Sequence, residues 1–223
     1  MKIWTKWDQI NTLVLLVFNY LSGKFQRTLL LFSGRELIIY RPLDLAIFIN
    51  NQASHLAQTS LYGYLRARAG GDFPRLFNDP DFVAAVNVAK WRIWLAAVGD
   101  LAIFAGGLLT AGGVAPAVAR GWTLETLTVI LDEAYRPVEA GGHFAAALVA
   151  QTRRVAADSL AADRPLDAIF HASPAALATW GPWDIPVVDN DLSILRNSVR
   201  YRWREPRAAL RRRVNVASFV EPG

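Results

Sequence analysis

The stretch "WRIWLAAVGDLAIFAGGLLTAGGVAPAVARGW", residues 91 to 122, decides how this chain folds. Its 27 residues from Ile93 to Ala119 include one formal charge, that of Asp100. A helix needs about 20 predominantly apolar residues to cross a bilayer, and a buried helix of a soluble core has a similar composition. The stretch therefore allows two interpretations, a membrane span and a core helix.

The energetics of membrane insertion are nearly balanced. The large apolar side chains between Ile93 and Thr110 favour insertion by roughly 4 kcal/mol in sum, whereas an Asp at the centre of the helix costs about 3 kcal/mol. Trp91, Trp94 and Trp122 lie near the ends of the stretch, as expected of residues at a membrane interface. Both interpretations remain open on these grounds.

The composition of the whole chain favours contact with a membrane or with a permanent partner. Of the 223 residues, 53% are hydrophobic and 19% are charged, against roughly 45–50% and about 25% in ordinary soluble domains. The chain has eight Trp and no Cys. Trp favours interfaces where one edge of the ring stays in water, and without Cys there are no disulfides, thiolate nucleophiles or zinc sites with Cys ligands.

The first 24 residues, "MKIWTKWDQINTLVLLVFNYLSGK", predict an amphipathic N-terminal helix. Its apolar residues recur at alternating steps of four and three, and Lys2 and Lys6 lie mostly on another face. Such a helix, which carries Trp4 and Trp7, either lies in a membrane interface or packs on the protein's own core. We expect no cleavable signal peptide, because Asp8 interrupts the basic start and no small-residue cleavage site follows.

Capping signals predict further helices in the first half of the chain. The clearest start is at Asp79 and Pro80, from which a helix of about 30 residues runs to Gly112 and Gly113. Another helix is expected from about residue 44 to residue 69, before a glycine pair. The apolar central helix, about residues 80–110, is the main element of this part.

The second half of the chain is also predicted to be helical. Thr123 is a plausible N-cap of one helix, and another helix resumes near His143 and runs to about Ala162. In this second helix, Val155 is expected to face inward and Arg154 outward. These patterns predict an N-terminal helical region, residues 1–120, with the membrane-like segment 93–119, and a C-terminal helical region, residues 121–223.

Small residues recur along one side of the central helix. At this spacing another backbone can approach closely, either from the same chain or from a second copy, so the face also fits a homo-oligomer. The residues expected to pack in this way are Gly99, Ala102, Gly106 and Gly107.

Acids and a histidine converge at one place in the sequence, around Glu133, Glu139 and His143. The Glu-x-x-His spacing of di-iron bundles is absent there, and the chain carries none of the familiar catalytic or nucleotide-binding signatures. We therefore expect no metal, no cofactor and no catalytic residue. A soluble helical enzyme with a site at these three residues is kept as an alternative.

The C-terminal segment "LRNSVRYRWREPRAALRRR" carries the strongest chemical bias of the chain. Eight arginines and one glutamate make it strongly basic. The alternation in "VRYRWR" predicts an extended or short-strand segment, with Val199, Tyr201 and Trp203 on one face. Arginine suits planar recognition of phosphate or carboxylate. The arginines expected to bind an anionic surface are Arg200, Arg202, Arg204, Arg207, Arg211, Arg212 and Arg213.

These patterns together predict a mainly helical, bundle-like protein that associates with a membrane. We expect a peripheral or monotopic position on the cytoplasmic side and a non-catalytic role as an accessory or scaffold protein. The basic segment would dock on lipid headgroups or on a membrane protein complex. Nucleic acid is a less favoured partner, because the rest of the chain has no helix-turn-helix, RRM or KH pattern.

Overall fold

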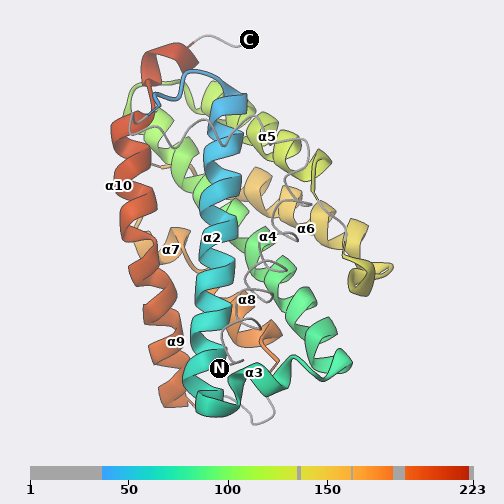
Figure 1. Cartoon of the computed structure of the whole chain (residues 1–223). Coiled ribbons are helices and arrows are strands. Elements are labelled where there is room, and N and C mark those ends of the chain that lie inside the picture. Colours follow the sequence, from blue (N-terminus) through green and yellow to red (C-terminus); the bar gives the residue numbers. More distant parts are fainter. Residues whose placement is uncertain (1–36, 135–136, 162, 183–188, 221–223) are drawn as a thin grey trace. The chain divides into compact units, whose positions relative to one another are not determined.

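The computed structural model describes residues 37–134, 137–161, 163–182 and 189–220 (Figure 1). They fall almost wholly within one compact unit that begins at Ile38. The predicted amphipathic N-terminal helix, with Trp4 and Trp7, lies outside the described residues.

The described chain is mainly helical, which confirms the predicted helical, bundle-like class. Short helices connect the long ones, and the only strand-like pairing within the described ranges is one parallel bridge between Ile39 and Val214. The helices of eight or more residues are α2 (Pro42–Ala69), α4 (Pro80–Ala111), α5 (Pro116–Asp132), α6 (His143–Ala157), α8 (Ala172–Trp180), α9 (Asp189–Arg202) and α10 (Arg204–Arg213). The short elements are η2 (Gly70–Asp72), α3 (Phe73–Leu76), η3 (Val138–Ala140), α7 (Leu166–Ile169) and η4 (Val216–Phe219).

Helix α4 starts and stops where its capping residues predict. The carboxylate of Asp79 accepts a hydrogen bond from the Asp81 backbone N–H at 2.9 Å, and Pro80 occupies the first helical position. At the other end Gly113 adopts a positive φ of 94°, a conformation that only glycine adopts at no steric cost. A helix of 32 residues results.

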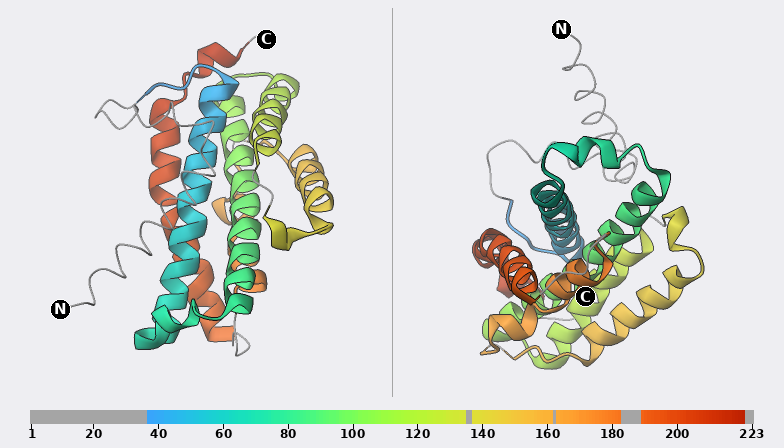
Figure 2. Two further views of the ribbon diagram at one scale, coloured as in Figure 1. Left: turned by 45° about the vertical axis from the view of Figure 1, so that its right-hand side comes forward. Right: turned by 90° about the horizontal axis from the view of Figure 1, so that it is seen from below.

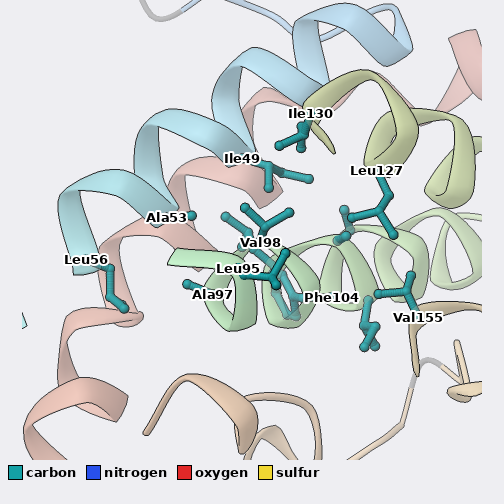
Figure 3. Close-up of a cluster of buried hydrophobic side chains, with 14 of the residues drawn as sticks. Ile49, Ala53, Leu56, Leu95, Ala97, Val98, Phe104, Leu127, Ile130 and Val155 are labelled. Atoms are coloured by element: carbon teal, nitrogen blue, oxygen red, sulfur yellow. The ribbon is translucent and has the colours of Figure 1, made fainter. Parts of the chain in front are cut away.

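Helix α4 is the centre of the bundle, with α2, α5, α6 and α8 packed around it (Figure 2). Figure 3 shows side chains of α2, α4, α5 and α6 meeting in one apolar cluster. The labelled members are Ile49, Ala53 and Leu56 of α2; Leu95, Ala97, Val98 and Phe104 of α4; Leu127 and Ile130 of α5; and Val155 of α6.

Among the described helices, α4 alone is long and apolar enough to cross a membrane. Of its apolar stretch, however, 78% is buried inside the bundle. The flanking tryptophans also contact the protein: Trp91 and Trp122 are buried, Trp122 Nε1 donates to the Phe219 carbonyl at 3.0 Å, and Trp94 Nε1 donates to Asn50 Oδ1 at 3.0 Å. Neighbouring helices therefore cover the apolar surface of α4 that lipid would cover in a membrane span.

Thr123 does not cap a helix, contrary to the sequence prediction. Helix α5 begins at Pro116, seven residues earlier, because Pro116 pre-sets the helical φ after the extended residue Ala115. Thr123 is buried inside α5, where its hydroxyl donates to the Ala119 carbonyl at 2.8 Å. The Thr123 hydroxyl therefore forms its hydrogen bond within the helix and does not cap the helix N-terminus.

The helix expected to reach Ala162 ends at Ala157 instead. Asp158 is extended, and its Oδ1 accepts from the Ser159 backbone N–H at 2.8 Å and from Arg164 Nη1 at 2.6 Å. This local bonding competes with continuation of the helix.

The basic C-terminal segment is helical, so the predicted extended or short-strand conformation is wrong. Its apolar residues follow steps of four and three, which is a helical period, and the six-residue alternation is only a short part of that longer pattern. Tyr201 is 68% exposed, although the strand prediction placed it with the buried Val199 and Trp203. The residues that face the bundle are Leu195, Val199, Trp203, Pro206 and Leu210.

Candidate functional site

A buried ion pair lies at the centre of the bundle. Asp100 of α4 is fully buried, and its Oδ1 pairs with Arg154 Nη2 of α6. Its Oδ2 accepts from the backbone N–H of Ser173 at 2.8 Å and from the Ser173 hydroxyl at 2.7 Å. Trp203 Nε1, between α9 and α10, donates to the same hydroxyl at 3.1 Å. The Asp100 carboxylate therefore links α4, α6 and α8, and the Ser173 hydroxyl extends this network to the α9–α10 junction.

Burial raises the pKa of Asp100 above the ordinary carboxyl value, and the charge of Arg154 and the hydrogen bonds from Ser173 oppose this rise. A buried carboxylate is costly unless it is paired and hydrogen-bonded. These contacts meet that requirement and give the apolar stretch from Ile93 to Ala119 a structural reason for its single charge.

The inward position of Arg154 corrects the sequence prediction that placed it on the outer face of α6. The guanidinium group lies against Gly99, where an added Cβ would stand 2.8 Å from Arg154 Nη1. Within the described residues, Arg154 Nε, Arg154 Nη1 and Gln151 Nε2 are buried without hydrogen-bond partners. The absence of a side chain at Gly99 leaves the space in which the Arg154 guanidinium reaches Asp100.

The predicted small-residue face of α4 is covered by segments of the same chain. An added Cβ at Gly106 would stand 2.9 Å from the methyl groups of Leu160, and Ala102 is buried. Gly107 is less crowded, since the nearest atom to an added Cβ is the Ala161 carbonyl oxygen at 3.9 Å. Close approach here serves packing within the chain.

A second site follows from the helical form of the basic segment. Arg200, Arg204, Arg207 and Arg211 are separated by four, three and four residues, so they form a stripe along one face of α9 and α10. We call these four residues the arginine stripe. Arg200 pairs with Asp167 at 3.5 Å, whereas the other three form no ion pair with a carboxylate in the described part of the chain.

Aromatic rings hold several of these guanidinium groups in place. Arg204 lies over the ring of Tyr201 at 5.4 Å, Arg207 over Phe170 at 5.7 Å and Arg211 over Phe104 at 5.1 Å. The pKa of Arg207 is lowered from its ordinary value, first by burial and then by the nearby charges of Arg211 and Arg204. The positive charges of Arg204, Arg207 and Arg211 are thus crowded together without an ion-pair partner among the described residues.

The remaining predicted arginines have different surroundings. Arg212 pairs with Glu205 at 3.1 Å, and Arg213 lies over the ring of Phe48 at 4.9 Å. Arg202 turns toward α2, where its Nη2 stands 3.4 Å from the position of a Cβ at Gly63. The seven arginines predicted as one set therefore divide into the stripe and these three.

A groove of about 730 Å³ lies between α2 and the α9–α10 junction. Helix α2 runs beside α9 and α10 in Figures 1 and 2. Its lining consists of Gln52, His55, Leu56 and Thr59 of α2 and of Tyr201, Arg202, Arg204, Glu205, Pro206, Arg207 and Ala208. The sequence indicated the arginines but not α2 as the opposite wall, because their meeting depends on the tertiary fold.

The acid and histidine cluster of the alternative enzyme hypothesis is a surface feature. Glu133 and His143 are exposed, and Glu139 Oε1 accepts from Asn87 Nδ2 at 2.9 Å. No three His, Cys, Asp or Glu residues in the described ranges come together as a metal site.

Comparison of the chain with known protein families, with curated proteins and with solved structures found no match.

Proposed function

We propose that this protein is a non-catalytic accessory or scaffold protein that docks on an anionic surface through the arginine stripe. The observation that carries the proposal is the crowding of Arg204, Arg207 and Arg211 on one helical face without a carboxylate partner among the described residues. Charges of one sign repel one another, and an anionic surface removes that repulsion. Rings beneath the guanidinium groups reduce the entropy that binding would cost.

The proposal places the protein peripherally at the cytoplasmic face of a membrane. Helices α9 and α10 belong to the same bundle as α4, so insertion of α4 would bring arginines toward the hydrocarbon at about 2.5 to 3.5 kcal/mol each. Anionic lipid headgroups instead attract each arginine by about 1 kcal/mol. The amphipathic pattern of residues 1–24 offers a second contact, and stable peripheral attachment generally needs two.

The test measures binding of the full chain to phosphatidylserine vesicles and to poly-glutamate, at low and at high salt. Removing two stripe charges together, Arg204→Gln and Arg211→Gln, is expected to cost about 2 kcal/mol, or roughly thirtyfold in vesicle affinity. Both side chains are exposed, so the substitutions should leave the fold intact.

The matched control removes two exposed arginines elsewhere, Arg75→Gln and Arg153→Gln. It changes the net charge equally but should weaken binding only severalfold. Binding to vesicles alone identifies lipid as the surface, and binding to poly-glutamate alone identifies an acidic protein. Equal losses in the two double variants, or no binding to either probe, would contradict the proposal.

A further inference from the structure

The groove between α2 and the α9–α10 junction has the size of a small-molecule site. Its volume is about 730 Å³, and ligand pockets generally span about 300 to 1,000 Å³. It is concave and has a wall on α2 that is separate from the arginine stripe. A flat surface of lipid headgroups would not contact the α2 wall. The groove therefore fits a different kind of ligand.

Charge in the groove is predominantly positive. Arg202, Arg204 and Arg207 belong to its lining, and Glu205 is its only acid. Glu205 already accepts a hydrogen bond from Arg212 Nη2 at 3.1 Å. Arg202, Arg204 and Arg207 form no ion pair within the described ranges, so three arginines border one hollow whose single carboxylate already pairs with Arg212.

The α2 wall adds polar side chains to this positive charge. Gln52, His55 and Thr59 are spaced by three and four residues, so they share a face of the helix. The amide of Gln52 and the ring of His55 can each donate a hydrogen bond, and neither bonds to another side chain in the described part of the chain. Thr59 donates to the His55 carbonyl at 2.8 Å, which fixes its hydroxyl oxygen beside the groove.

We propose that this groove binds the phosphate group of a small phosphorylated molecule. A phosphate monoester has three terminal oxygens and nearly two negative charges, which suit a groove bordered by several arginines better than the two oxygens and single charge of a carboxylate. The exposed ring of Tyr201 lies at the same groove and offers an apolar surface to the organic part of the ligand. This inference deepens the proposed function, because the groove shares Arg204 and Arg207 with the arginine stripe.

The test is a calorimetric titration of the full-length protein with inorganic pyrophosphate, beside succinate as a dicarboxylate. We expect saturable one-to-one binding of pyrophosphate and at least tenfold weaker binding of succinate. Gln52→Trp fills the groove while keeping every arginine, and Arg202→Gln removes one groove charge; each should weaken pyrophosphate binding by about tenfold or more. The Arg202 side chain is exposed, so that variant should fold even if Gln52→Trp does not.

Arg211→Gln provides the matched control, since Arg211 belongs to the stripe but does not line the groove. It should change pyrophosphate affinity less than twofold and weaken vesicle binding, whereas Gln52→Trp should leave vesicle binding unchanged. If Arg211→Gln and Arg202→Gln lose the same pyrophosphate affinity, the binding reflects diffuse charge attraction, and the proposed phosphate site is overturned. If the protein binds vesicles but shows no saturable binding of pyrophosphate, only the phosphate-site proposal is overturned. If it binds pyrophosphate but not vesicles, only the docking proposal is overturned.

Discussion

Replacing Asp100 with leucine is expected to lower the free energy of unfolding by about 3 to 5 kcal/mol. The substitution leaves the Arg154 guanidinium inside the bundle without its counter-charge and removes the acceptor of two hydrogen bonds from Ser173. Urea unfolding followed by circular dichroism measures the change. A loss of this size would be a large fraction of the stability of an ordinary domain.

Two controls show whether the loss belongs to the buried pair. The double substitution of Asp100 and Arg154 by leucine should recover much of the loss, because an apolar pair often replaces a buried ion pair at little cost. Asp72→Leu breaks the exposed pair with Arg75 and should cost less than about 1 kcal/mol. If the double variant loses as much as the two single variants added together, Asp100 and Arg154 are not energetically coupled.

Trp203→Ala is expected to destabilise the protein by about 3 to 5 kcal/mol. The indole is 1% exposed, its ring centroid lies 4.9 Å from that of Phe170, and its N–H bonds to Ser173. The substitution therefore leaves a large cavity beside the buried ion pair. Trp203→Phe keeps most of the apolar volume and should cost less, and the same urea unfolding measures both.

Tyr201→Ala is the control for Trp203→Ala, because the two side chains would lie on the same face if this segment were a strand. In the helix Tyr201 is 68% exposed, so its loss should change the free energy of unfolding by no more than about 0.5 kcal/mol. Comparable losses at both positions would mean that the segment is not helical in this register.

Elements with strong local signals could be predicted from the sequence. Asp79 and Pro80 at the start of α4, and the glycines at its end, act through the backbone of their own segment, so no tertiary information is needed to recognise them. The helical class follows from the same signals together with the apolar period of the longer segments.

The errors arise where two local signals compete. "VRYRWR" alternates like a strand for six residues, but the apolar period from Leu195 to Leu210 is helical and longer, and burial of that whole line outweighs the short alternation. Thr123 is an acceptable N-cap, but Pro116 starts the helix earlier and leaves Thr123 inside it. Both errors are avoided when the sequence pattern is followed over a segment longer than the short motif.

The two sites differ in how far the sequence could reveal them. The arginines were evident, because eight of them fall within 18 residues. The partner of Asp100 was not, since a lone charge in an apolar stretch requires a counter-charge without identifying which residue supplies it. Arg154 is 54 positions away along the chain, and only the packing of α6 on α4 brings the two together.

The proposal that α4 lies in the core of the bundle and does not cross a membrane is tested most directly by cysteine labelling at its two ends. The chain has no Cys, so Asp81→Cys and Ala111→Cys, both at exposed positions, each provide a single reactive thiol. Intact cells and lysates are treated with a maleimide that cannot cross membranes. A core helix predicts that both thiols behave alike in intact cells and that both react in the lysate. Reaction of only one of the two thiols in intact cells would place the ends of α4 on opposite sides of a membrane and contradict the proposed peripheral position.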